Sequence, residues 1–192
     1  MTATGISVRP FESPDDYFGM IDYFHNLSDE MMLRMGVDRS RLPSRAEWFD
    51  HAWRDHHLSE RDPLRERFFL AWIVDGELVG HSSINQIQWG DQACAHLHLW
   101  RSDLRKAGAG TELFRQSIST YFTRFDLQRV IVEPHAENPA PNRVLEKLEF
   151  RFVRKYRCVP GPVNFEQDVN RYEVDRATWL ARHPSNDPRL AD

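Results

Sequence analysis

A glycine-containing loop carries the most suggestive chemistry in this sequence. Residues 105–110 read Arg-Lys-Ala-Gly-Ala-Gly, between a strand-like run and a helix-like run. Gly108 and Gly110 lack a Cβ, so the backbone can curl there and let N–H groups converge on an anion. The helix that begins near Thr111 adds unpaired N–H groups and a positive dipole end. We therefore predict a phosphate-binding loop, and the local alternative is an ordinary strand-to-helix turn with basic residues at the surface.

Two histidines lie on the predicted strand Ala93–Trp100 that leads into this loop. Side chains of a strand alternate between its faces, so His96 and His98 share one face. A histidine that titrates near neutrality can accept a proton from a substrate, directly or through water. The pair is therefore a candidate for general base catalysis, and the alternative for each ring is an ordinary hydrogen-bonded place in the strand.

The same His-x-His pattern can also hold a metal ion, because both imidazoles point to one side of the strand. A third and a fourth ligand would be needed, and His81, Glu133 and His135 are the candidates. This alternative predicts a metal-dependent hydrolase. It leaves the glycine loop unexplained, so we expect no metal. Glu133 and His135 are also further candidates for a general base.

Hydrophobic periodicity predicts the elements that must position these residues. A helix should begin at Ser13-Pro14, and the turn Asp75-Gly76 should join two strands as a hairpin. The segment Met31–Ser44 resembles an irregular connection. The expected strands are Ile6–Phe11, Phe68–Val74, Glu77–Ile84, Ala93–Trp100, Arg129–Glu133, Phe150–Val159 and Asn170–Val174, and the other expected helices are Ala46–His57, Thr111–Phe125 and Asn142–Leu148.

The spacing within the loop excludes two common nucleotide-binding patterns. No Lys-Ser or Lys-Thr pair follows the glycines, and Leu113 occupies the third glycine position of G-x-G-x-x-G. The pattern that fits is R-x-x-G-x-G, which resembles the pyrophosphate loop of the GNAT superfamily of acyl-CoA-dependent N-acyltransferases. Downstream, Asn138 and the helix that ends in Lys-Leu-Glu-Phe150 resemble a second block of that family. The chain is most similar to the branch of ribosomal-protein-alanine acetyltransferases.

This resemblance implies an acetyl-CoA-dependent N-acetyltransferase that works by direct attack of an amine in a ternary complex. His98, with His96 as second candidate, would then deprotonate the amine. Asn138 would hydrogen-bond the pantetheine arm, although a helix cap explains it equally well. The pyrophosphate would bind Arg105, Lys106, Ala107, Gly108, Ala109, Gly110 and Thr111, and the pantetheine arm would lie along Leu99, Trp100 and Arg101.

Three positions depart from the family pattern. Glu149 stands where the family usually has glycine, so the turn there is expected to use a different backbone conformation. Pro141 stands where the nearest branch often has serine. Leu145 replaces the tyrosine that protonates the departing thiolate in many members, so the general acid is not assigned. A catalytically inactive acyl-CoA-binding protein is therefore a further alternative.

Length and composition predict one α+β domain over residues 1–192, with its acyl-CoA-binding core at about 93–150. By resemblance, a mixed, mostly antiparallel sheet should be flanked by helices and splay open between its fourth and fifth strands. A net charge of −4 argues against a nucleic-acid partner. The sequence has no membrane-spanning run, and we expect a cytoplasmic protein.

The acceptor is expected to be a small-molecule or peptide amine, and a homodimer is one of the open oligomeric states. The acceptor pocket should be built from Phe18–Ser44 and from Pro160–Asn170. If the loop in and just after the first of these segments overhangs the pocket, four arginines there can recognise an acidic group on the substrate. These arginines are Arg34, Arg39, Arg41 and Arg45.

Overall fold

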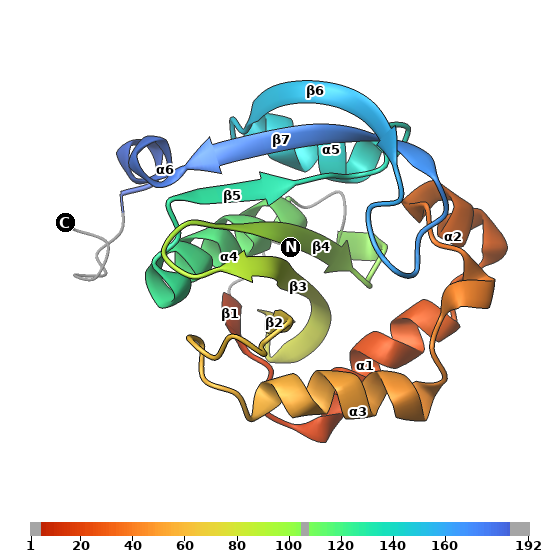
Figure 1. The fold of residues 1–192 in the computed structure, drawn as a ribbon. Coiled ribbons are helices and arrows are strands. Elements are labelled where there is room, and N and C mark those ends of the chain that lie inside the picture. The colour runs from red at the N-terminus through yellow and green to blue at the C-terminus, as the bar shows by residue number, and fades with distance from the viewer. Residues whose placement is uncertain (1–4, 105–107, 185–192) are drawn as a thin grey trace.

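The computed structural model describes residues 5–104 and 108–184 and has a seven-stranded sheet at its centre (Figure 1). The strands are β1 (Ile6–Pro10), β2 (Arg67–Val74), β3 (Glu77–Gln88), β4 (Gln92–Leu99), β5 (Arg129–Val132), β6 (Arg151–Cys158) and β7 (Gln167–Asp175). They lie in the order β1-β2-β3-β4-β5-β7-β6. Every neighbouring pair is antiparallel except β4 and β5, which are parallel. The predicted mixed, mostly antiparallel sheet is confirmed.

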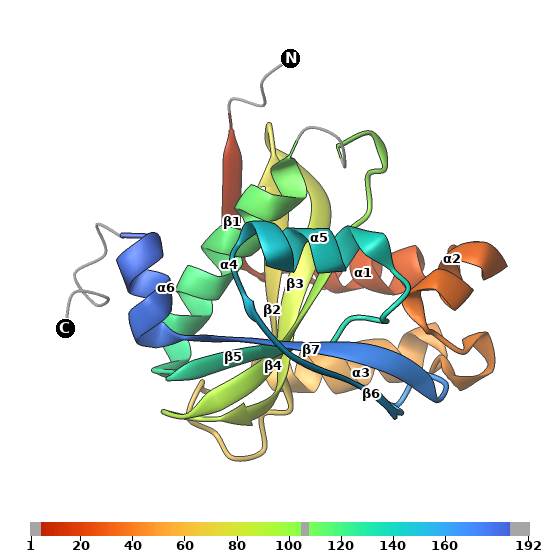
Figure 2. The ribbon, with the colours of Figure 1, turned by 90° about the horizontal axis from the view of Figure 1, so that it is seen from above.

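Helices cover both faces of the sheet (Figure 2). They are α1 (Pro14–His25), α2 (Asp29–Met35), the short 3-10 helix η1 (Arg39–Arg41), α3 (Arg45–His56), α4 (Ala109–Phe125), α5 (Pro139–Lys147) and α6 (Arg176–Arg182). Side chains of α4, α5 and α6 join one buried cluster with one face of the sheet, and side chains of α1, α2 and α3 join a second cluster on the other face. In the part of the chain that the structure describes, no helix is long and apolar enough to cross a membrane.

Helix α4 anchors the first cluster because its apolar residues recur at helical spacing. Phe114, Ile118 and Tyr121 have no exposed surface, and burying each such side chain contributes roughly 1.5–3 kcal/mol. The Tyr121 hydroxyl donates to Ser82 Oγ of β3 at 2.9 Å, and the indole N–H of Trp72 donates to Ser117 Oγ at 2.9 Å. These bonds satisfy the buried polar groups and fix the middle of α4 against the sheet.

The sheet opens between β4 and β5. Their parallel ladder consists of three pairs only and ends where Cys94 faces Ile131. From Ala95 onward β4 continues its ladder with β3, and β5 continues beside β7 instead. This is the predicted splay between the fourth and fifth strands. It leaves one edge of β4 facing a gap beneath the N-terminal ends of α4 and α5.

Three local features differ from the sequence-based expectations. The structure contains α2 inside the segment expected to be irregular, and it adds α6 after β7. Both helices have seven residues, which is too short for a clear apolar period, but Ser28 and Asp175 cap their first turns. Glu149 has φ +56°, so it adopts the left-handed conformation that the usual glycine would adopt. The expectation of a different conformation at this turn was wrong.

Candidate active site

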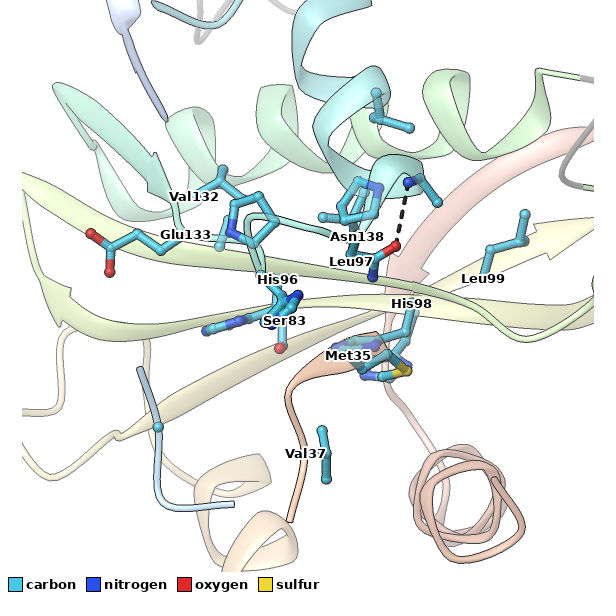
Figure 3. Close-up of a pocket in the computed structure, with 18 of the residues that line it drawn as sticks. Met35, Val37, Ser83, His96, Leu97, His98, Leu99, Val132, Glu133 and Asn138 are labelled. Carbon is cyan, nitrogen blue, oxygen red and sulfur yellow. Dashed lines mark hydrogen bonds between the residues drawn. The ribbon is translucent and has the colours of Figure 1, made fainter. Parts of the chain in front are cut away.

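A cavity of about 680 Å³ runs through the opened sheet (Figure 3). One end reaches the first residues of α4 and α5, where Gly110 and Asn138 line it. Its middle follows β4 along Leu97 and His98. The other end lies under α1, α2 and the loop between β6 and β7, where Tyr23 is among the lining residues. The cavity thus joins the predicted phosphate-binding loop to the predicted acceptor pocket.

The described part of the phosphate-binding loop is Gly108–Thr111. Gly108 has φ +76°, a left-handed conformation, and precedes the first turn of α4. A Cβ on Gly108 would meet no atom within 4 Å, so glycine is needed there for its backbone conformation and not for space. Gly108, Gly110 and Thr111 line the cavity, as an anion site at a helix N-terminus requires. Ala109 is buried beneath them, and the predicted contacts at Arg105, Lys106 and Ala107 lie outside the described residues.

The first turn of α5 lies across the gap from α4. Asn138 caps it, because its side-chain oxygen accepts from Ala140 N–H at 3.3 Å, and Asn138 also lines the cavity (Figure 3). Both interpretations of Asn138 are therefore geometrically compatible. Behind it, Asn142 donates to the carbonyl of His135 at 3.1 Å and ties the loop to the helix. Arg143 lines the same end of the cavity and adds positive charge.

The side of β4 that does not pair with β3 faces the gap. Trp100 N–H donates to Val79 O of β3 at 2.9 Å, and alternate residues of a strand direct their backbone groups to opposite sides. The backbone groups of Leu97 and Leu99 are therefore directed toward the gap. This is the geometry in which an amide-bearing arm pairs like an added strand.

The neighbouring predicted contacts, Trp100 and Arg101, have side chains engaged elsewhere. The indole N–H of Trp100 donates to His81 Nδ1 at 3.0 Å, and its ring stacks on Tyr23. Arg101 is exposed and forms ion pairs with Glu77 at 3.0 Å and with Asp103 at 2.8 Å. Because the backbone N–H of Trp100 is bonded to β3, the backbone of Arg101 is the part of these two residues that remains a candidate for contact with the arm.

His96 and His98 project from one face of β4, as predicted (Figure 3). The ring of His98 stacks on His81 with centroids 4.7 Å apart and meets Phe24 edge-on. Burial, helped by the nearby Arg67 cation, lowers the pKa of His96 to about 4. Burial, helped by His96, lowers the pKa of His98 to about 3. Both rings are therefore neutral at physiological pH and have a lone pair available.

The remaining sequence candidates also line the cavity. Glu133 accepts from the Tyr156 hydroxyl at 2.6 Å and from Arg171 at 3.0 Å. His135 holds a buried Nδ1 that has no hydrogen-bond partner in the structure. Within residues 5–104 and 108–184, no group of three or more histidine, cysteine, aspartate or glutamate side chains is arranged to hold a metal ion. The metal-dependent alternative therefore finds no ligand set among them.

The two segments expected to form the acceptor pocket meet over the cavity. Asp38 N–H donates to Val163 O at 2.8 Å, and the Asn164 side chain donates to Gly36 O at 2.8 Å. Of the four arginines in and just after the first segment, Arg34 alone lines the cavity. The other three form outward ion pairs: Arg39 with Asp29, Arg41 with Asp38 and Arg45 with Asp22.

Sequence reasoning missed part of the floor of the cavity. Arg67, Ser83 and Asn85 line it from β2 and β3. They lie on the same sheet face as the two histidines, since Arg67 pairs with Asn85 and Ser83 pairs with His96 across neighbouring strands. The sequence signal for these positions was the alternation of side chains along Arg67–Phe69 and Ser83–Asn85, which places alternate residues on one face. Locating the positions against β4, however, requires the strand register.

The comparison with known families decides the class of the protein. A family model described as an acetyltransferase (GNAT) domain matches residues 6–151, which include the opened strands and both blocks of sequence. The chain belongs to the GNAT acetyltransferase family. The expectation of an acyl-CoA-dependent N-acyltransferase is confirmed by this match, and no curated protein sequence matches the chain significantly.

Solved GNAT structures resemble this one throughout their length. A spermidine N-acetyltransferase from Vibrio cholerae, in complex with CoA and spermine, has a TM-score of 0.73 at 15% identity and covers 91% of this chain and 98% of its own. RimL, a ribosomal L7/L12 alpha-N-protein acetyltransferase in complex with CoA, has a TM-score of 0.70 at 17% identity. The match covers 91% of this chain and 96% of RimL. At these identities the likeness shows that the fold is shared.

Proposed function

We propose that this GNAT protein transfers the acetyl group of acetyl-CoA to a primary amine, by direct attack of the amine within a ternary complex. The single observation that carries the proposal is the continuous cavity through the opened sheet. It connects a helix N-terminus suited to phosphates with a pocket that holds two neutral histidines. The solved relatives with CoA bound support the same donor.

The described residues fit the donor. Gly108 and the first turn of α4 would hold phosphate oxygens through backbone N–H groups, and Arg143 and Lys147 line the same end with positive charge. The backbone of β4 at Leu97 would pair with an amide group of the pantetheine arm. When bound, acetyl-CoA supplies the thioester that the amine attacks.

The histidines would then assist removal of a proton from the amine. An ammonium has no lone pair, so the amine must be neutral when it attacks. His98 would accept a hydrogen bond from it and pass the proton to cavity water, with His96 as second candidate. Because burial keeps His98 neutral, its lone pair is available to accept this hydrogen bond at physiological pH. A backbone N–H of β4 would stabilise negative charge that develops on the thioester oxygen.

A thermal-shift assay with acetyl-CoA and with longer acyl-CoAs tests the donor. We expect acetyl-CoA to raise the melting temperature, because binding to the folded state alone stabilises it, by about 2.7 kcal/mol at a ligand concentration of 100 Kd. Release of free CoA with a panel of amines then tests catalysis. Absence of any shift with every acyl-CoA would refute donor binding. A shift without CoA release from any amine would instead indicate an acyl-CoA-binding protein without transferase activity.

A further inference from the structure

Arg67 lines the end of the cavity away from the donor. Its guanidinium has no carboxylate within 4.0 Å in residues 5–104 and 108–184, although Arg65 and Arg54 nearby on the chain are both engaged in bonds. Burial lowers the pKa of Arg67, and the nearby Glu66 and Asp55 carboxylates offset this shift only in part. Arg67 is partly buried, and a cation withdrawn from water without a paired anion is costly, so such residues are usually paired.

Unpaired acceptor atoms accompany this cation. Asn85, the cross-strand neighbour of Arg67, has a buried Oδ1 with no hydrogen-bond partner in the structure. His96 has a buried Nε2 in the same condition. Buried polar groups in folded proteins are normally hydrogen-bonded, so these two atoms are available to a ligand or to water. A ligand that suits it has an anionic group for Arg67 and N–H groups for Asn85 and His96.

The charged residues along the cavity also favour a ligand with an anionic group. Among the described residues, its charged lining is four cations and one carboxylate: Arg34, Arg67, Arg143, Lys147 and Glu133. Glu133 is already paired with Arg171. Arg143 and Lys147 lie at the donor end, on α5. Arg34 and Arg67 lie on α2 and β2, and neither has an ion-pair partner among the residues whose structure is described.

The register of the strands gives the approximate distance between Arg67 and the two histidines. Arg67, Asn85 and Cys94 are successive cross-strand neighbours, and His96 and His98 follow Cys94 by two and four residues. With strands about 4.8 Å apart and a rise of about 3.3 Å per residue, the Cα of Arg67 is roughly 12 Å from that of His96 and roughly 16 Å from that of His98. Both kinds of side chain extend into the cavity, so the ligand spans a shorter distance.

We propose that the acceptor is a small amine that also bears a carboxylate, which Arg67 binds while the amine lies beside His96 and His98. This inference rests on the proposed function and names the substrate class of the same site. The anion would pair with the partly buried guanidinium through charge-assisted hydrogen bonds. The acetyl-pantetheine arm shares the cavity, which favours a small acceptor. A polyamine would place a second cation against Arg67 and Arg34 and is disfavoured.

The test is calorimetric binding to the full-length protein saturated with CoA. The probes are ω-amino acids from glycine to 6-aminohexanoate, each paired with its own amide, which keeps the shape and removes the charge. We expect at least one acid to bind tenfold or more tightly than its amide, in line with a charged hydrogen bond. Equal binding of acid and amide throughout the series, or no binding by any acid, would overturn the inference.

Two variants assign the preference to Arg67. Arg67→Gln should bring the affinity of the acid down to that of the amide. Asn85→Asp should do the same with Arg67 retained, because it places a carboxylate at the cross-strand position and would occupy the cation. Arg45→Gln, which removes an exposed arginine paired with Asp22, is the matched control and should keep the preference. A preference that survives both Arg67→Gln and Asn85→Asp would contradict the assignment.

The two proposals fail in different ways. If acetyl-CoA gives no thermal shift, the proposed function fails. If acetyl-CoA stabilises the protein and neutral amines are acetylated as well as their carboxylated partners, only the substrate class fails. Persistence of the acetyl-CoA shift in Arg67→Gln and Asn85→Asp shows that both variants are folded.

Discussion

His81 lies on β3, outside the two family-like sequence blocks, and it helps to orient the proposed base, His98. Its Nδ1 accepts the indole N–H of Trp100, and burial lowers its pKa well below the ordinary value, so the ring is neutral with its proton on Nε2. The flat face of His81 stacks on His98. Trp100 thus fixes His81, and His81 limits the rotation of His98. The hydrogen bond and the stack together hold the proposed base toward the cavity.

The first prediction concerns Gly108. Gly108→Glu should abolish the thermal shift with acetyl-CoA, because it places a carboxylate at an anion site and a side chain on a left-handed residue. Gly90→Glu is the control, since Gly90 has φ +74° and equally open surroundings but does not line the cavity. A normal acetyl-CoA shift in Gly108→Glu would show that the loop is only a turn.

The second prediction concerns His98. His98→Ala should lower kcat by about a hundredfold, the typical share of a positioned general base, with little change in acetyl-CoA affinity. Because the pKa of His98 is about 3, the wild-type rate should show no histidine inflection between pH 5 and pH 8. His51→Ala, at an exposed histidine of α3, should leave kcat unchanged. Full turnover in His98→Ala would move the base to His96 or Glu133.

At the scale of elements, two short connections do most to shape the acceptor end. Helix α2 stops at Gly36, whose carbonyl accepts from Asn164 and from Gln167 at 3.1 Å. The loop between β6 and β7 therefore binds directly to the C-terminus of α2. Neither segment would form this contact alone, because each is too short to bury its own backbone groups. Together they close the cavity above Arg34 and Val37.

The third prediction tests this contact. Gly36→Ala should lower the free energy of unfolding by about 2 kcal/mol, because Gly36 has φ +70° and a Cβ would overlap the Gln167 amide. Urea denaturation measures the change. The KM for the acceptor should rise while acetyl-CoA affinity stays the same. Gly76→Ala, with φ +83° and no neighbour within 4 Å, has the strain without the overlap and is the control. An equal loss in both variants would rule out a role for the overlap.

At the scale of the whole molecule, buried histidines make the folded state sensitive to acid. His81, His96 and His98 form a group on one sheet face, and burial lowers the pKa of each below its ordinary value of about 6.5. Arg67 faces His96 from β2 and opposes its protonation further. The folded protein therefore keeps these rings neutral at a pH where the unfolded chain protonates them.

The fourth prediction follows from that difference. Between about pH 6.5 and pH 4 the unfolded state binds more protons, so the free energy of unfolding should fall as the pH falls, by at most about 1.4 kcal/mol per pH unit for each histidine. Urea denaturation at several pH values measures the slope. His98→Phe should make it shallower, and His51→Ala should not. A free energy of unfolding that is constant across this range would contradict the prediction.

The chain order of the elements was predictable because it depends on local patterns. The period-two alternation around His96 gave β4, and the hairpin at Asp75-Gly76 is confirmed by the pairing of β2 with β3. The order of the two blocks around Gly108 and Asn138 gave the family. The short helix α2 was missed, because seven residues carry too little periodicity.

The sequence by itself was enough to predict a donor end, because a glycine loop and a helix start act through backbone groups of consecutive residues. Only the tertiary structure decided the acceptor end. There Arg67, Asn85 and His96 come from three strands and share a floor through the sheet register, and the net charge of −4 does not reveal that most charged residues among the described lining of the cavity are cations. Burial also lowered the pKa of both candidate histidines, since desolvation depends on packing, which residue types and spacing do not specify.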